Sequence, residues 1–144
     1  MSFIAICGGG GKSYICNKYP DKFLDLDVFI YDNIKNDEKK TLFDYIENND
    51  FDKIGEIYKD VMIKNKNKLI NLDKIVLGHH PINAEYLDLE CIDIIKPNKE
   101  LHEKNIQFRE NNLKEIARNC WNNLFNSYIY KSHLDFEYRL LLHC

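Results

Sequence analysis

Apolar runs along the chain predict the buried strands of a sheet. Four runs, at residues 3–7, 23–27, 75–77 and 91–95, are bounded by polar, glycine or proline residues. The first is apolar without interruption, which is typical of a strand buried on both faces of a sheet. The run at 23–27 becomes acidic toward its end, where Asp25 and Asp27 stand.

Helical spacing of apolar residues separates these runs. The clearest pattern begins at Asn112 and continues through Tyr128, and a second covers residues 51–70. Shorter helices are expected at 12–19, 38–48, 82–88, 99–109 and 133–142. Strands that alternate with helices predict one α/β domain over residues 1–144, with a mainly parallel sheet of four to five strands and helices on both faces.

Composition and charge are typical of a single globular domain and exclude several classes of protein. The chain has 144 residues, 44% of them hydrophobic, which suffices for the core of one domain. The net charge of −3 argues against a general binder of nucleic acid or membrane surfaces. No apolar run approaches the roughly 20 residues of a membrane span, and no signal peptide is recognisable. Five scattered cysteines indicate reduced thiols, so we expect a cytoplasmic protein.

A glycine-rich segment directly after the first strand has the composition of a phosphate-binding loop. It consists of Gly8, Gly9, Gly10, Gly11, Lys12 and Ser13. Glycines let backbone N–H groups point at an anion, the lysine reaches nucleotide phosphates, and the serine hydroxyl binds Mg²⁺. The loop is shorter than the usual G-x-x-x-x-G-K-[ST], because Ile6 stands where the first glycine belongs. The alternative is a glycine-rich turn without a ligand.

In a parallel sheet, ligands bind beyond the carboxyl ends of the strands. This rule brings together the glycine loop, residues 25–27, residues 78–81 and residues 96–99. Asp25 and Asp27 are two apart on the predicted strand, so both side chains are expected on one side. A carboxylate pair can hold Mg²⁺ and orient an acceptor during phosphoryl transfer. The alternative is that either aspartate only caps a following helix.

Two histidines and two arginines complete the candidate site. His79 and His80 follow the third strand, where they would contact substrate or phosphate; the alternative is a loop histidine bonded to backbone. Arg109 and Arg118 lie on either side of a break in the helical pattern. Guanidinium groups clamp phosphates and stabilise the charge of transfer. The alternative is two solvated arginines.

The chain resembles the P-loop nucleotide kinase-like proteins of phages and large DNA viruses, which group with nucleoside monophosphate and shikimate-type kinases. The resemblance covers most of the chain. It lies in the glycine loop with Lys12 and Ser13, the segment 23–27, residues 73–77 running into His79-His80, residues 95–101, Arg109, and Asn119-Cys120-Trp121. The richness in Lys, Asn and Ile, which have AT-rich codons, fits an AT-rich genome such as that of a large virus.

The resemblance implies a single-domain P-loop NTPase fold with a lid at about residues 97–118. It also implies ATP as phosphoryl donor on the glycine loop and Mg²⁺ on Ser13 and Asp25. Lys12, Asp25, Arg109 and Arg118 would be catalytic, and Asp27 would bind the acceptor, a nucleoside monophosphate and by preference a deoxynucleotide. His79 and His80 are predicted to bind the acceptor from their position after the third strand. The protein would act in the host cytoplasm, and a homodimer is compatible with these features. Two alternatives remain open: a nucleotide-binding sensor or decoy without transfer, and a polynucleotide 5′-kinase.

Overall fold

Five parallel strands form one sheet in the order β2-β3-β1-β4-β5. The computed structural model describes residues 1–144. The strands are β1 (Ser2–Ile6), β2 (Phe23–Asp25), β3 (Ile75–Gly78), β4 (Glu90–Pro97) and β5 (Tyr128–Tyr130). This order, with the glycine loop directly after the central strand, is consistent with a P-loop-like fold and confirms the predicted fold class.

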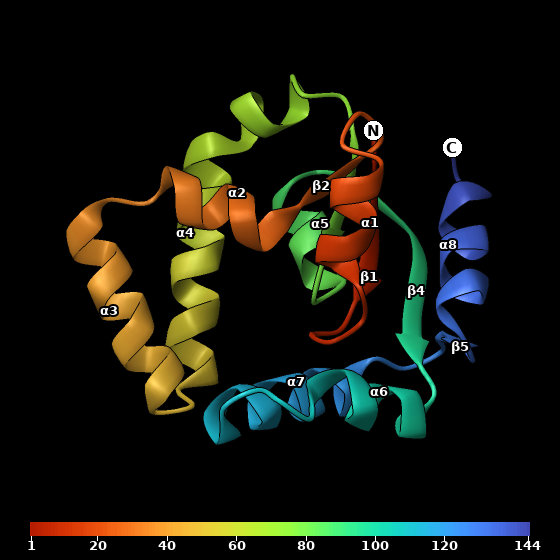
Figure 1. Cartoon of the computed structure of the whole chain (residues 1–144). Coiled ribbons are helices and arrows are strands. Elements are labelled where there is room, and N and C mark those ends of the chain that lie inside the picture. Colours follow the sequence, from red (N-terminus) through yellow and green to blue (C-terminus); the bar gives the residue numbers. More distant parts are fainter.

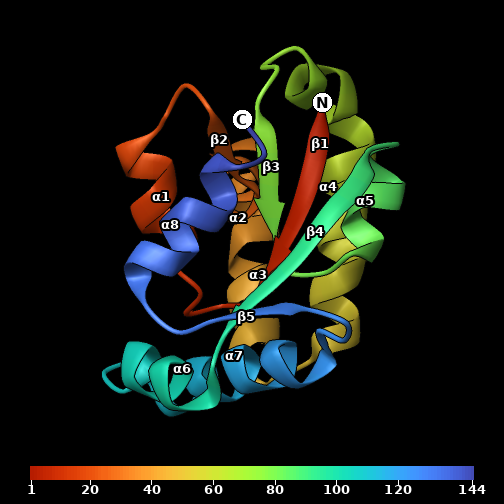
Figure 2. The same cartoon turned by 90° about the vertical axis from the view of Figure 1, so that its right-hand side faces the viewer.

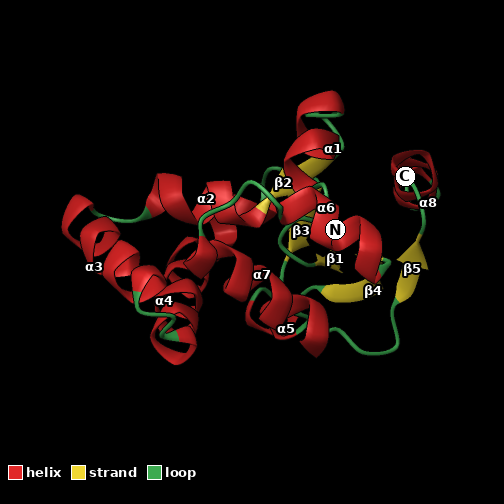
Figure 3. Cartoon of the chain, turned by 60° about the horizontal axis from the view of Figure 1, so that its bottom comes forward, coloured by secondary structure: helices red, strands yellow, loops and turns green.

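The chain forms eight helices (Figures 1 and 3). They are α1 (Lys12–Lys18), α2 (Leu26–Asn33), α3 (Asn36–Glu47), α4 (Phe51–Ile70), α5 (Ile82–Tyr86), α6 (Lys99–Ile106), α7 (Asn111–Asn123) and α8 (His133–Leu141). Figure 2 shows α1 and α8 on one face of the sheet, α4 and α5 on the other, and α6 and α7 across the carboxyl ends of the strands. The segment 97–118, which the sequence predicts as a lid, contains α6 and the first part of α7.

The central strand divides the apolar core into two parts. Phe3 and Ala5 point to the face covered by α2, α4 and α5, whereas Ile4 and Ile6 point to the face covered by α1 and α8. All four side chains are fully buried, as expected for a strand between two helical layers. None of the helices combines the length and the apolar composition that a membrane span requires.

The expected strand at 23–27 is wrong in its second half. The strand ends at Asp25, and α2 begins at Leu26. The reason is capping: the Asp25 carboxylate accepts a hydrogen bond from the Asp27 N–H at 3.0 Å, which starts the helix. The two aspartates are therefore a helix cap and a first-turn residue, and do not form an alternating pair on a strand.

The expected helix from Asn112 through Tyr128 is also wrong at its end. The helix ends at Asn123, and Asn126 takes a left-handed conformation with φ of 54°. The chain then extends as β5, which pairs with β4 through Ile95 opposite Tyr128 and Pro97 opposite Tyr130. The apolar residues after the helix, Tyr128 and Tyr130, belong to the sheet. Their conformation is decided by pairing with β4 and not by the helical spacing that they continue.

Candidate active site

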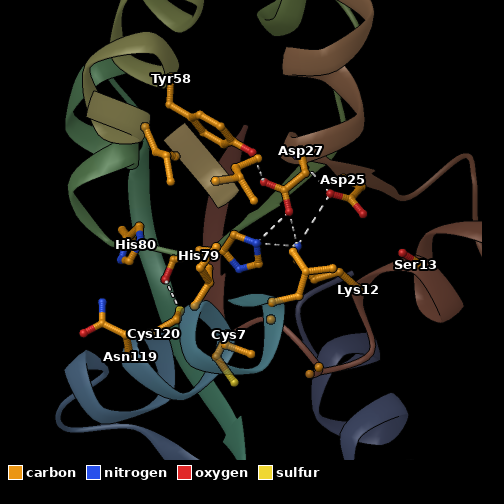
Figure 4. A pocket seen from close by; sticks show the side chains of 18 of the residues that line it. Cys7, Lys12, Ser13, Asp25, Asp27, Tyr58, His79, His80, Asn119 and Cys120 are labelled. Carbon is orange, nitrogen blue, oxygen red and sulfur yellow. Dashed lines mark hydrogen bonds and ion pairs between the residues drawn. The ribbon is translucent and has the colours of Figure 1, made fainter. Parts of the chain in front are cut away.

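A cavity of about 630 Å³ opens at the carboxyl ends of the strands. Its walls come from the glycine loop, the start of α2, helices α3 and α4, the segment after β3, and α7. Figure 4 shows the polar side chains that converge in it. Most of the predicted residues line this cavity: Gly8, Gly9, Gly10, Gly11, Lys12, Ser13, Asp25, Asp27, His79, His80 and Arg109.

The glycine loop has a backbone that only glycine tolerates at two positions. Gly9 and Gly11 have φ of 78° and 96°, in the left-handed region. A Cβ at Gly9 would also collide with Ile106. The N–H of Gly10 donates to Cys7 O at 2.9 Å, whereas the N–H groups of Gly8, Gly9 and Gly11 donate to no protein acceptor. The loop therefore offers free backbone donors beside a cavity, which is what an anion needs.

Lys12 stands at the floor of the cavity, between two acidic side chains. Its Nζ lies 2.7 Å from Asp27 Oδ2 and 3.7 Å from Asp25 Oδ1, and the side chain is buried. Burial alone would lower the pKa of Lys12, but attraction to Asp27 and Asp25 outweighs it and raises the pKa above its ordinary value. Lys12 is thus a fixed cation beside the free N–H groups of the loop.

His79 is a second cation at the same place. Its Nε2 lies 2.6 Å from Asp27 Oδ2, and its Nδ1 lies 3.1 Å from the carbonyl oxygen of Ile6. Both neighbours are acceptors, so both ring nitrogens carry a proton. Burial would lower the pKa of His79, but the carboxylate of Asp27 raises it to about 9. Lys12 Nζ is 3.2 Å from His79 Nε2, and Asp27 holds the two cations together.

Asp27 is the centre of this arrangement. It accepts from Lys12, from His79 and from the hydroxyl of Tyr58, which donates to Oδ1 at 2.8 Å. Burial would raise the pKa of Asp27, but His79 and Lys12 hold it well below its ordinary value, so it is a carboxylate. Burial and Asp27 raise the pKa of Tyr58 well above its ordinary range, which keeps its proton in place. We call Lys12, Asp27 and His79 the charged end.

Another part of the cavity wall is apolar. Five side chains from α3, α4 and α7 and their flanks line it, and we call them the apolar end: Ile46, Phe51, Ile54, Leu113 and Ile116. Asn83 lines the cavity with only 6% of its surface exposed, and its side chain makes no hydrogen bond within the protein. Burial and the neighbouring cation of His79 lower the pKa of His80, so this ring is neutral at pH 7.

Tyr58 and Asn83 are two of the cavity residues that the sequence reasoning missed. Tyr58 lies on the apolar stripe of α4 and is typical of a core residue, and its contact with Asp27 depends on how α4 packs. Asn83 stands in a short helix with no motif around it. The one usable signal for Asn83 was its place, just after the third strand.

The two arginines predicted for the site, Arg109 and Arg118, lie in different environments. Arg109 lines the cavity, and its Nη1 lies 3.6 Å from the point where a Cβ at Gly8 would stand. Arg118 is outside the cavity wall, where its guanidinium forks onto Glu103 with two contacts of 2.8 Å in an exposed position. The position of Arg118 therefore gives no support to the catalytic role predicted for it.

Ser13 and Asp25 have the chemistry for Mg²⁺. Both line the cavity, and both present oxygen atoms, which Mg²⁺ prefers. The Ser13 hydroxyl has no hydrogen bond within the protein, whereas Asp25 uses Oδ1 to cap α2 and leaves Oδ2 without a protein partner. Mg²⁺ beside phosphates needs only one or two protein ligands, so this pair fits the predicted metal.

Fold and loop together define a P-loop-like α/β domain with a cavity at its glycine loop. No protein-family model, curated protein or solved structure matches the chain. The function therefore has to be argued from the geometry of the cavity.

Proposed function

We propose that the protein is an ATP-dependent kinase that transfers the γ-phosphoryl group to a nucleotide-type acceptor, by preference a deoxynucleoside monophosphate. One observation carries the proposal. The wall of a single cavity of about 630 Å³ combines a glycine loop and two fixed cations with a set of apolar side chains. This space accommodates the phosphates of two nucleotides at the charged end and a base at the apolar end.

The donor side is supported by the loop and Lys12. The N–H groups of Gly8, Gly9 and Gly11 would hold phosphate oxygens, and Lys12 would exchange part of its contact with Asp27 for the β- and γ-phosphates. Ser13 and Asp25 would hold Mg²⁺, which neutralises charge on these phosphates when bound.

The acceptor side is supported by His79 and Arg109. A monophosphate approaching the γ-phosphate is repelled by its negative charge, and a protonated histidine and a guanidinium reduce that repulsion. An oxygen of the acceptor phosphate forms the new bond to the γ-phosphorus. The bond from that phosphorus to the β,γ-bridging oxygen breaks, and ADP leaves with the electron pair. Asp27 keeps His79 protonated and Lys12 in place.

The apolar end and Asn83 would bind the base of the acceptor. The Asn83 carboxamide has no hydrogen bond within the protein, so its donor and its acceptor are available to a ligand in the cavity. Asn83 has both a donor and an acceptor, which match the polar edge of a base, while Ile54 and Leu113 would contact its faces. Neutral His80 offers a further polar contact.

The test is product formation from ATP and Mg²⁺ with a panel of ribo- and deoxynucleoside monophosphates, followed by chromatography. We expect ADP and a new nucleoside diphosphate with at least one acceptor. Tight ATP binding without product from any acceptor would instead support the sensor or decoy. Product with only a 5′-hydroxyl oligonucleotide would support the polynucleotide kinase. A thermal-shift screen selects the ligands first, because binding at a hundred times Kd adds about 2.7 kcal/mol to stability.

A further inference from the structure

Three side chains from outside the glycine loop hold its carbonyl groups. His102 Nε2 donates to Gly8 O at 2.7 Å, Asn105 Nδ2 donates to Gly9 O at 3.0 Å, and the Tyr130 hydroxyl donates to Gly10 O at 2.5 Å. Three consecutive peptides thus have one side-chain donor each. We propose that these three residues, the carbonyl clamp, are positioning residues that set the affinity of the short loop for polyphosphate.

The argument begins with the planarity of the peptide bond. In a trans peptide the C=O and the following N–H point in opposite directions, and the chain has no cis bond. Holding the carbonyls of Gly8 and Gly10 against α6 and β5 therefore aims the N–H groups of Gly9 and Gly11 the other way. These two N–H groups have no acceptor in the protein. The clamp thus fixes the direction of the donors that the phosphates would meet.

The donors of the clamp are themselves held. His102 is almost fully buried, and its ring stacks on Trp121 with centroids 6.2 Å apart. Tyr130 is fully buried against Phe136, with centroids 4.8 Å apart. Burial lowers the pKa of His102, so its ring is neutral at pH 7 and donates through the Nε2 proton. The loop is therefore preorganised by groups that lose little further freedom when an anion binds.

A shortened loop has a particular need for such support. It has fewer peptides than the usual pattern, and glycine peptides have more conformational freedom than any others. A free loop of this composition would lose that freedom on binding, which weakens affinity. Because the clamp already restricts the loop in the unbound protein, less conformational entropy is lost when an anion binds. This inference rests on the proposed binding of phosphates by the loop, but it does not depend on transfer to an acceptor.

The experiment compares two tyrosines of the same strand. Tyr130→Phe removes the hydrogen bond to Gly10 O, and Tyr128→Phe removes a hydrogen bond of 2.7 Å to Asp135, away from the loop. Calorimetric titration with tripolyphosphate, without Mg²⁺, gives Kd for each folded variant. We expect Kd to rise about fivefold in Tyr130→Phe, as for one lost hydrogen bond, and to stay at the wild-type value in Tyr128→Phe. Melting temperatures without ligand are measured alongside.

A purely structural role would lower the melting temperature of Tyr130→Phe without changing Kd, and that result would overturn the proposal. If Tyr130→Phe does not fold, His102→Phe replaces it, because His102 holds the carbonyl of Gly8 and thereby the free N–H of Gly9. His143→Phe is its control, because His143 Nε2 bonds Asp93 Oδ2 at 2.7 Å away from the loop. A wild-type protein that does not bind tripolyphosphate overturns the clamp together with the phosphate loop. Binding that depends on the clamp, with no ADP formed with any acceptor, supports the clamp and contradicts only the kinase.

Discussion

The charged end and the apolar end of the cavity are constructed in different ways. At the charged end, Lys12, Asp27 and His79 lie within hydrogen-bond distance of one another, and Tyr58 fixes the remaining oxygen of Asp27. At the apolar end, Phe51 and Leu113 are 40% and 38% exposed and belong to neither buried core cluster. On the proposed function, the groups that would meet phosphate are in place before any ligand binds, whereas Phe51 and Leu113 on the wall that would bind the base can adjust to a ligand. Ile46 and Ile54 of the same wall pack against the core. The following predictions test this division.

Lys12→Ala is expected to have the largest effect, because it removes the cation that the loop directs at the phosphates. Turnover should fall about 1,000-fold, as for loss of a main charge-stabilising group. The measurement is kcat with saturating acceptor, in a protein shown to be folded by circular dichroism. Lys18→Ala is the matched control, since Lys18 is on the same helix and pairs with Glu137 at the surface. Wild-type turnover in Lys12→Ala would contradict the assignment of the phosphate loop.

Asp27→Asn should lower turnover about 100-fold, because His79 and Lys12 lose the anion that positions them. Binding of ATP without metal should stay the same or become tighter, since a negative charge leaves the site. Asp25→Asn should instead raise the Mg²⁺ concentration needed for half-maximal turnover. Titration of Mg²⁺ against rate separates the two variants. If both respond to Mg²⁺ as the wild type does, the two aspartates are only structural.

The charged end should also affect the pH dependence of stability through His79. Its pKa is about 9 in the folded protein, above the ordinary value near 6.5. A raised pKa stabilises the fold fully below about pH 6.5, and this contribution is lost as the pH rises through about 9. We expect the free energy of unfolding to fall by on the order of 2 kcal/mol over that window. Urea titrations at several pH values measure this fall.

His79→Asn should reduce that fall, whereas His133→Asn, at an exposed position, should keep it. Equal pH profiles in the wild type and in His79→Asn would show that the ion pair with Asp27 contributes nothing to stability.

Substitutions of Arg109 and Arg118 test whether either arginine acts together with the charged end. Arg109→Lys should lower kcat about tenfold, because an ammonium cannot reproduce the planar fork of the guanidinium. Arg118→Lys should leave kcat unchanged, because Arg118 pairs with Glu103 outside the cavity and exposed pairs contribute little. The measurement is kcat and KM for both variants with the best acceptor. An effect of Arg118→Lys as large as that of Arg109→Lys would mean that the segment of α6 and α7 moves when ligands bind.

The smallest effect is expected at the apolar end. Ile54→Ala should raise KM for the acceptor about fivefold, through lost apolar contact, and leave KM for ATP unchanged. Ile63→Ala is the control, since Ile63 is on the same helix, 53% exposed and outside the cavity. A change in KM for ATP as large as that for the acceptor would remove the distinction between the two ends.

The sequence predicts local structure well where one signal dominates. The glycine loop, the central strand and the 51–70 helix follow from composition and spacing, and α4 has the expected bounds. The prediction was wrong where two signals compete. Asp25 ends an apolar run and also caps a helix, and the cap decides the conformation. Tyr128 continues a helical spacing, yet pairing with β4 places it in a strand.

The candidate site is predictable only in part, for a related reason. Lys12, Asp27 and His79 follow strands of one sheet, so the rule for carboxyl ends brings them together. Tyr58 and Asn83 reach the cavity from helices, and their contribution depends on how those helices pack on the sheet. Periodicity places Tyr58 on the apolar stripe of α4 without showing that this stripe meets a ligand, and the five residues of α5 are too few to show a period for Asn83.

The bond from Tyr130 to Gly10 joins residues 120 positions apart in the chain. A nascent chain therefore carries its glycine loop long before the ribosome adds the residue that holds the third carbonyl. Contacts of such separation also form late in folding, because closing a long loop costs entropy before the contact returns any stability. Incomplete chains should therefore hold nucleotide poorly, so that retention on immobilised ATP selects molecules that have finished folding.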